Sequence, residues 1–130
     1  MKSNYQGITA EKWEDIVKAV KESKRKTNQS EDVLYEGVEQ RGNRKHFYCY
    51  DNYDRYESPG LDFVLHGDSN EGVLYVYNSS EMARAPITLD QGLKIAKNFF
   101  NYEGSMMAED IVCDYVMDNE GKGAKLSGLA

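Results

Sequence analysis

The chain has little of what would place it outside the class of small globular domains. It contains two prolines and two cysteines among 130 residues, and 40% of its residues are hydrophobic. A hydrophobic fraction of this size with so little proline argues against a disordered chain. The length suits a single domain over residues 1–130 that buries a core without disulfides. No stretch approaches the ~18 consecutive apolar residues of a membrane span.

The N-terminus and the cysteines bear on the cellular compartment. Residues 1–6 lack the apolar core of a signal peptide. Cys49 and Cys113 lie far apart in the chain, and disulfides are rare in the cytosol. We therefore expect a cytoplasmic protein in which both cysteines are buried thiols rather than a disulfide.

Basic residues are scarce in the second part of the chain. Residues 1–45 hold ten Lys and Arg against eight Asp and Glu, whereas residues 46–130 hold six against fourteen, which together give a net charge of −6. Residues 51–81 hold seven carboxylates and one cation, and residues 101–120 hold six carboxylates and no cation. A surface of this sign repels nucleic acid and anionic membranes and attracts basic proteins. We therefore expect a basic protein partner, with no direct nucleic-acid or membrane binding.

The first regular pattern in the chain is that of an amphipathic helix. Thr9 can cap it, and apolar residues follow at the spacing i, i+3, i+4 and i+7, at Trp13, Ile16, Val17 and Val20. Acidic residues lie at its start and lysines at its end, an order that suits the helix dipole. The lysine-rich end is therefore explained without nucleic-acid binding.

The middle of the chain has the alternation and the β-branched and aromatic content of strands. Four strands are expected, over residues 33–40, 45–51, 61–66 and 73–77. The Gly-flanked connection at 67–72 is short enough for a hairpin. The expected sheet is an antiparallel meander whose longest loop runs from 51 to 60.

Helical patterns return in the last third of the chain. Residues 88–91 fit a capping box, and the apolar stripe that follows leads to Phe100, with Gly104 as the expected helix end. Residues 106–117 fit either a helix or a strand, and we favour the helix. Residues 119–130 are rich in glycine and are expected to form a mobile tail. The expected fold is α+β, with an N-terminal helix, about four antiparallel strands, and one or two C-terminal helices packed on one face.

Candidate metal ligands and catalytic groups are sparse. The two histidines and two cysteines, His46, His66, Cys49 and Cys113, lack the close local pairing of a zinc site. The spacing of His46 and Cys49 places them on opposite faces of a strand. Residues 51–57 lack the ligand order of a calcium loop, and no sequence context identifies a nucleophile or an acid–base pair. We therefore expect no metal, no cofactor and no catalytic activity.

An aromatic and acidic loop is the strongest candidate for a binding site. Tyrosines alternate there with carboxylates, and tyrosine is enriched at interface hot spots. The candidate partner-binding residues, on this loop and on the turn at 67–72, are Asp51, Tyr53, Asp54, Tyr56, Glu57, Asp68 and Glu71. Two alternatives stay open. Tyr48 and Tyr50 can be ordinary strand residues beside a solvated loop, or the acidic region at 103–120 can be the contact surface.

Residues 60–101 resemble one group of bacterial immunity proteins, those that protect cells against polymorphic or contact-dependent toxins. The resemblance lies in the apolar strands 61–65 and 73–77 and in the segment 85–93, which leads into a helix ending at Phe99 and Phe100. The Gly-Glu-Leu-Pro-like turn and late tryptophan of that group are absent, and the only tryptophan is Trp13. The resemblance implies a small, cytosolic, non-catalytic protein that occludes a cognate toxin, often a nuclease with a basic cleft.

Charge and resemblance thus predict the same function, an acidic binding protein that neutralises a basic protein partner by occlusion. A phage-encoded inhibitor of a nucleic-acid-binding protein has the same sequence character, because both imitate the charge of the natural substrate. The alternative is a small-molecule-binding or enzymatic α+β domain that uses its tyrosines as pocket walls.

Overall fold

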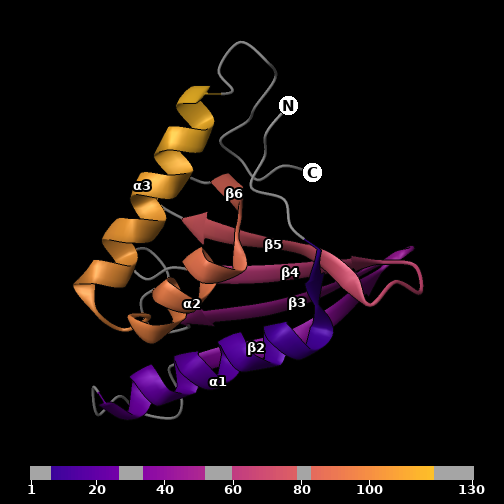
Figure 1. Cartoon of the computed structure of the whole chain (residues 1–130), viewed down its shortest axis with the longest axis horizontal. Coiled ribbons are helices and arrows are strands. Elements are labelled where there is room, and N and C mark those ends of the chain that lie inside the picture. The colour runs from indigo at the N-terminus through magenta and orange to yellow at the C-terminus, as the bar shows by residue number, and fades with distance from the viewer. Residues whose placement is uncertain (1–6, 27–33, 52–59, 79–82, 119–130) are drawn as a thin grey trace.

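One antiparallel sheet with three helices packed against it organises the chain (Figure 1). The computed structural model describes residues 7–26, 34–51, 60–78 and 83–118. Its elements, in chain order, are β1 (Ile8–Thr9), α1 (Ala10–Lys26), β2 (Leu34–Arg41), β3 (Arg44–Asp51), β4 (Gly60–His66), β5 (Glu71–Asn78), β6 (Ala83–Ile87), α2 (Leu89–Lys97) and α3 (Tyr102–Asp118). The expected α+β fold is confirmed.

The meander itself matches the sequence pattern. β2, β3, β4 and β5 are successive antiparallel neighbours, with Phe63 of β4 lying between Phe47 of β3 and Leu74 of β5. The turn between β2 and β3 contains Gly42 at φ 59°, a left-handed conformation that favours glycine. All four strands expected from the sequence are therefore present, with ends that differ by a few residues.

Two further strands complete the sheet along the outer side of β5. β1 pairs with the first residues of β5, and β6 pairs with the remainder, with Ile87 opposite Leu74. The sequence did not predict either one. β1 has only two residues, and β6 contains Pro86, which cannot donate a ladder hydrogen bond and is confined to positions such as edge strands.

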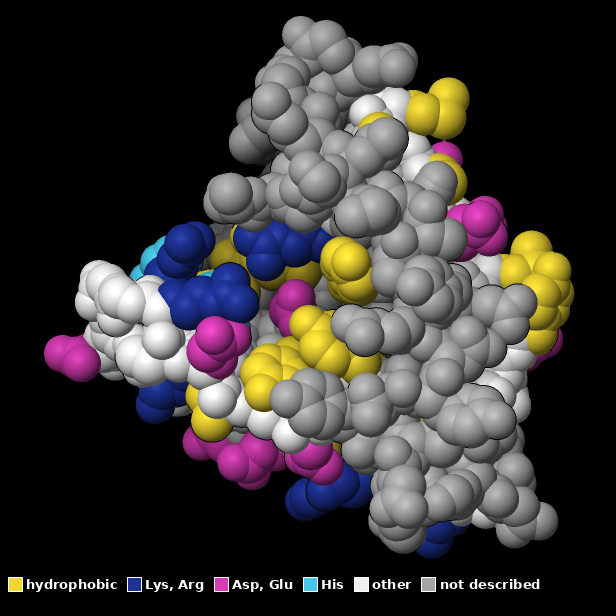
Figure 2. Space-filling model, turned by 180° about the vertical axis from the view of Figure 1, so that it is seen from behind, with side chains coloured by type: hydrophobic (Ala, Val, Ile, Leu, Met, Phe, Trp, Pro, Cys, Tyr) yellow, Lys and Arg dark blue, Asp and Glu magenta, His cyan; other side chains and the backbone are white. Residues whose placement is uncertain are grey.

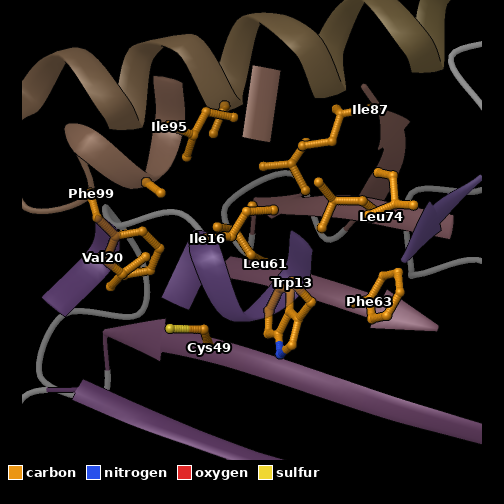
Figure 3. Packing of buried hydrophobic residues seen from close by; sticks show 14 of the residues in the cluster. Trp13, Ile16, Val20, Cys49, Leu61, Phe63, Leu74, Ile87, Ile95 and Phe99 are labelled. Carbon is orange, nitrogen blue, oxygen red and sulfur yellow. The ribbon is translucent and has the colours of Figure 1, made fainter. Parts of the chain in front are cut away.

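The hydrophobic core lies between the helices and one face of the sheet. Trp13 of α1 stacks on Phe63, with ring centroids 5.9 Å apart and planes 11° from parallel. Figure 3 shows Ile16 of the same helix beside Leu61 of β4. Burying a side chain of this size contributes roughly 1.5–3 kcal/mol, so the apolar stripe of α1 is sufficient reason for the helix to pack here.

α2 begins as expected but ends earlier, and α3 begins at Tyr102, before the expected start at 106. The Thr88 hydroxyl accepts from the Gln91 amide, and the Gln91 side chain accepts from the Thr88 amide, which confirms the capping box. α2 ends at Lys97, and the expected end at Gly104 is wrong. Gly104 lies in the first turn of α3, where an added Cβ would sit 2.1 Å from the Asn98 carbonyl oxygen. This glycine therefore allows a close approach between the helices.

The preference for a helix over residues 106–117 is confirmed by α3. Figure 1 shows α3 beside β5 and β6, with α2 between α3 and α1. The expected tail, residues 119–130, lies outside the described residues, as do residues 52–59 of the expected long loop. None of the described helices has the length and hydropathy needed to span a membrane.

Candidate functional site

The structure describes three of the seven residues predicted to bind a partner. Asp51 is the last residue of β3, while Asp68 and Glu71 are exposed in the connection between β4 and β5 and at the start of β5. Asp51 lies near Gly60 at one end of β4, and the connection that carries Asp68 follows His66 at the other end. The length of β4, about 20 Å at ~3.3 Å per residue, separates them. The two groups do not form one patch. The other four predicted residues, Tyr53, Asp54, Tyr56 and Glu57, lie outside the described ranges.

The outer side of α3 is the most acidic described surface. Its exposed residues recur at helical spacing and include five carboxylates but no Lys or Arg. We call this surface the α3 acidic face and define it as Tyr102, Glu103, Met106, Glu109, Asp110, Asp114, Met117 and Asp118. Apart from Tyr102, it lies within the region 103–120 that the sequence left open as the alternative contact surface.

Glu103 lies in the first turn of α3, where the helix dipole favours a carboxylate, but the other four carboxylates are not explained by helix stability. The last turn contains no basic residue, although cations are favoured at a helix C-terminus. Asp110, Asp114 and Asp118 follow one another at i, i+4 spacing, and like charges at that spacing are destabilising by roughly 0.2–0.5 kcal/mol per pair. In α2, by contrast, the acidic residue lies in the first turn and two lysines lie in the last. The charges of Asp110, Asp114 and Asp118 therefore destabilise α3.

The α3 acidic face also carries exposed apolar side chains. Of the four large hydrophobic residues that are exposed in the described ranges, three lie on α3, with exposed fractions of 77% for Tyr102, 41% for Met106 and 70% for Met117. Methionine adapts its shape to a partner and is common on protein-binding surfaces. Exposed apolar side chains beside charges of one sign are a composition common at protein-binding surfaces.

A second cluster of functional groups lies on the sheet face that points away from the core, which we call the opposite face. Strand alternation places Tyr48 and Tyr50 of β3 there, together with Tyr77 of β5. The rings of Tyr48 and Tyr50 stack with centroids 5.5 Å apart, and Tyr77 meets Tyr50 edge-on at 6.4 Å. The prediction that Tyr48 and Tyr50 are strand residues is confirmed, and both are half-buried.

Two glycines make room for these rings. An added Cβ at Gly37 would lie 2.5 Å from the Tyr48 hydroxyl oxygen, and one at Gly60 would lie 2.6 Å from Cδ1 of Tyr50. Such distances are too short for a real side chain, so the absence of a Cβ on the neighbouring strands lets both rings lie close to the sheet.

Asp62 is the carboxylate at the centre of the opposite face. It lies between Tyr48 and Tyr75 in register, and the Tyr50 hydroxyl donates to its Oδ1 atom at 3.3 Å. Burial raises the pKa of Asp62 to about 6, although the positive charge of Arg84 and the hydrogen bond from Tyr50 favour the ionised form. Burial, followed by the nearby Asp62 charge, also raises the pKa of Tyr50. The pKa of Asp62 is thus closer to neutral pH than that of an exposed aspartate.

The cysteines and histidines form no metal centre in the described residues, where no group of three or more His, Cys, Asp or Glu side chains is arranged to hold a metal. Cys49 lies in the core, and burial raises its pKa to about 12, whereas His46 lies on the opposite face, so the prediction that the two point apart is confirmed. Cys49 and Cys113 are not joined in a disulfide, and Cys113 is half-buried rather than buried as expected.

Sequence reasoning missed Asp62. The alternation of Leu61, Phe63 and Leu65 placed it on the non-core face of a strand, where a carboxylate is ordinarily solvated. A signal was nevertheless present, because tyrosines occupy the same face of the two predicted neighbouring strands.

Comparison of the chain with protein-family models, with curated proteins and with solved structures finds no significant match.

Proposed function

We propose that the protein is a non-catalytic binding domain that neutralises a basic protein partner by covering its working surface, as an immunity protein does to a nuclease toxin. The observation that carries this proposal is the α3 acidic face, where five carboxylates and no cation surround exposed Tyr102, Met106 and Met117. The excess of carboxylates over the whole chain supports the same sign of partner.

The two kinds of side chain on this face have different roles in the proposal. The carboxylates attract a basic protein over a distance and raise the association rate, an effect that salt screens within ~8 Å at physiological ionic strength. The apolar side chains slow dissociation, because an aromatic or methionine anchor that loses contact with water stabilises the complex. A basic cleft lined partly by apolar groups is the matching surface.

The predicted loop stays in the proposal as a further contact region. Its residues Asp51, Tyr53, Asp54, Tyr56 and Glu57 combine carboxylates with tyrosines, the same chemistry as the α3 acidic face. The exposed Asp68 and Glu71, at the other end of β4, belong to a separate region.

The experiment begins by identifying the partner through its contact with α3. A photo-crosslinking amino acid at position 106 reports on the α3 acidic face, and the same amino acid at the exposed position 18 of α1 serves as the control. A basic protein captured from position 106 and not from position 18 supports the proposal. An acidic protein captured from position 106 contradicts it.

Charge reversal then tests the surface with the purified partner. The variant Glu109→Lys, Asp110→Lys, Asp114→Lys is compared with Glu11→Lys, Glu14→Lys, Asp15→Lys on the exposed side of α1, because each set adds six units to a net charge of −6. We expect the α3 set to weaken binding at least about tenfold, or ~1.4 kcal/mol, with the α1 set close to wild type. Equal losses in the two sets would show that only net charge matters.

A second candidate function, a small-molecule-binding or enzymatic domain, is favoured by the tyrosines around Asp62 on the opposite face. Aromatic walls with one buried polar group are typical of ligand pockets. A thermal-shift screen distinguishes this candidate. A metabolite that stabilises the wild type and not Asp62→Asn supports it, whereas a screen without such a compound favours the protein-binding function.

A further inference from the structure

One side of the sheet ends in an open strand. β2 is the last strand on that side, and its eight residues pair with β3 without interruption. On the other side of the sheet, β5 pairs with β1 and β6, and α3 lies beside β6 (Figure 1). Within the described ranges, β3 is the only strand that pairs with β2. Proteins commonly protect such an edge with a proline or a β-bulge, and β2 contains neither.

The turn between β2 and β3 determines which backbone groups lie on this edge. Gly42 and Asn43 form a two-residue turn, which makes Arg41 and Arg44 the closing pair of the hairpin. The closing pair of such a hairpin exchanges both of its backbone hydrogen bonds, and the bonded pairs then alternate along the strands. The amide and carbonyl groups of residues 36, 38 and 40 therefore point away from β3 and can pair with another strand.

The acidic side chains of β2 have partners of opposite charge within the chain. The Lys21 ammonium of α1 lies 3.0 Å from the Glu36 carboxylate, and Glu39 accepts from Arg41 at 3.0 Å. Figure 2, which shows the molecule from behind, likewise shows Lys and Arg side chains next to acidic ones. The edge therefore lacks the concentration of one sign that α3 carries, and it offers little charge repulsion to a second copy of the chain.

An exposed apolar side chain lies in the middle of this edge. Val38 is 55% exposed and is the one large exposed hydrophobic residue outside α3 in the described ranges. It lies opposite Phe47 of β3, on the core side of the sheet. Trp13 of α1 meets Phe47 with ring centroids 6.4 Å apart, so α1 covers β3 at this point and leaves Val38, one strand further out, in contact with solvent. A strand that paired with β2 would cover this side chain.

We propose that β2 pairs antiparallel with β2 of a second copy of the chain, so that the two sheets join. A twofold axis through Val38 places this residue opposite its own copy, which buries two exposed apolar side chains. In the same register Glu36 lies opposite Gln40. Gly37 lies opposite Glu39, so within these pairs no two like charges face each other. An axis through Glu36 or Glu39 instead places two carboxylates opposite each other, which is destabilising.

Pairing through β2 uses none of the residues of the α3 acidic face and does not depend on the function proposed for that face. α3 lies at the β5 and β6 side of the sheet, away from β2 (Figure 1). Both copies in the dimer therefore keep their acidic face open to a partner. The tests of partner binding and of strand pairing can consequently fail separately.

Sedimentation equilibrium between ~1 μM and ~1 mM protein measures the dimer. A strand pair of about seven residues is a small interface, so we expect a dissociation constant of roughly 10–100 μM. Val38→Lys places two ammonium groups opposite each other and should weaken the dimer at least about tenfold. Met117→Lys adds the same charge at another exposed apolar residue, on α3, and is the matched control that should dimerise like the wild type.

Two further measurements distinguish this dimer from unfolding and from pairing elsewhere. Val38→Pro removes an amide that β3 does not use, so it should abolish the dimer while the circular dichroism stays that of a folded chain. Amide exchange by NMR should slow with rising concentration at residues 36, 38 and 40, whereas residues 37 and 39, which bond to β3, should change less. The proposal is overturned if the protein stays monomeric up to ~1 mM, if Val38→Lys and Met117→Lys dimerise equally, if Val38→Pro still dimerises, or if exchange at 36, 38 and 40 does not depend on concentration.

Discussion

Replacing Asp62 by Asn should make the protein more stable at neutral pH, although it removes a hydrogen-bonded charge. Asp62 is the carboxylate that accepts from Tyr50 on the opposite face, and its pKa is raised from 3.8 to about 6, chiefly by burial. Each pKa unit corresponds to 1.36 kcal/mol, so keeping the group ionised in the folded protein above pH 6 costs about 3 kcal/mol. Asn occupies the same volume, keeps an acceptor for Tyr50 and carries no charge.

The sign of the pH dependence follows from linkage. A carboxyl group with a raised pKa binds its proton more tightly in the folded state, so its contribution stabilises at low pH and is lost as the pH rises from about 4 to about 6. The stability advantage of Asp62→Asn should therefore be about 3 kcal/mol at pH 7.5 and fall below about 1 kcal/mol at pH 4. His46 acts in the opposite direction, because its pKa is lowered, but it is present in both proteins and cancels in the comparison.

Urea unfolding followed by circular dichroism at pH 7.5 and pH 4 measures both quantities. Asp68→Asn is the matched control, because Asp68 is an exposed carboxylate on the turn after β4, and exposed substitutions ordinarily change stability by no more than about 0.5 kcal/mol. The reasoning fails if Asp62→Asn is less stable than the wild type at pH 7.5, or if its advantage is the same at both pH values.

Three other predictions concern packing, thiol reactivity and the acidic helix. Gly104→Ala should destabilise the protein by about 1–3 kcal/mol in urea unfolding, because the new Cβ meets the Asn98 carbonyl oxygen at 2.1 Å; an unchanged midpoint would show that α3 can move without loss. Cys49, with its pKa raised to about 12 in the core, should resist alkylation in the folded protein while the half-buried Cys113 reacts. Mass spectrometry of the modified peptides measures both rates, and faster alkylation of Cys49 than of Cys113 would contradict this prediction. Asp114→Lys should stabilise the protein by about 0.3–1 kcal/mol, because it replaces like-charge i, i+4 pairs with Asp110 and Asp118 by opposite-charge pairs, and should weaken partner binding. Tighter binding together with higher stability would argue against a binding role for α3.

Much of the fold was predictable because its signals are local. The stripe of α1 and the capping box at Thr88 each lie within one helix, and the four meander strands carry their own alternation. β6 depends on contacts distant in sequence, whereas the early end of α2 is local, because Asn98 caps the helix and its side chain donates to the Lys94 carbonyl oxygen at 3.0 Å. Pro86 is tolerated because β6 pairs along β5 at the side of the sheet, and α2 stops at Lys97, although the apolar pattern continues to Phe100.

The candidate site was predictable in charge but not in position. The acidic density of residues 101–120 is evident in the sequence, yet only the helical structure shows that Met106 and Met117 share the exposed side with the carboxylates. Asp62 was missed for a different reason. Its burial and its neighbours arise from strands that are paired in the folded sheet, and a single strand pattern carries no information about a charge on the strand beside it.

The central claim is that a basic partner binds the α3 acidic face, and its most direct test is the salt dependence of association. The association rate of the partner captured from position 106 is measured by stopped flow from low salt to ~0.5 M, where screening shortens the range of charge attraction to a few ångströms. For the wild type and the α1 charge-reversal variant, the rate should fall at least about tenfold over this range. For the α3 charge-reversal variant, the rate should start low and change little. A wild-type rate that stays flat with salt, or an α3 variant that associates as fast as the α1 variant, would contradict the claim.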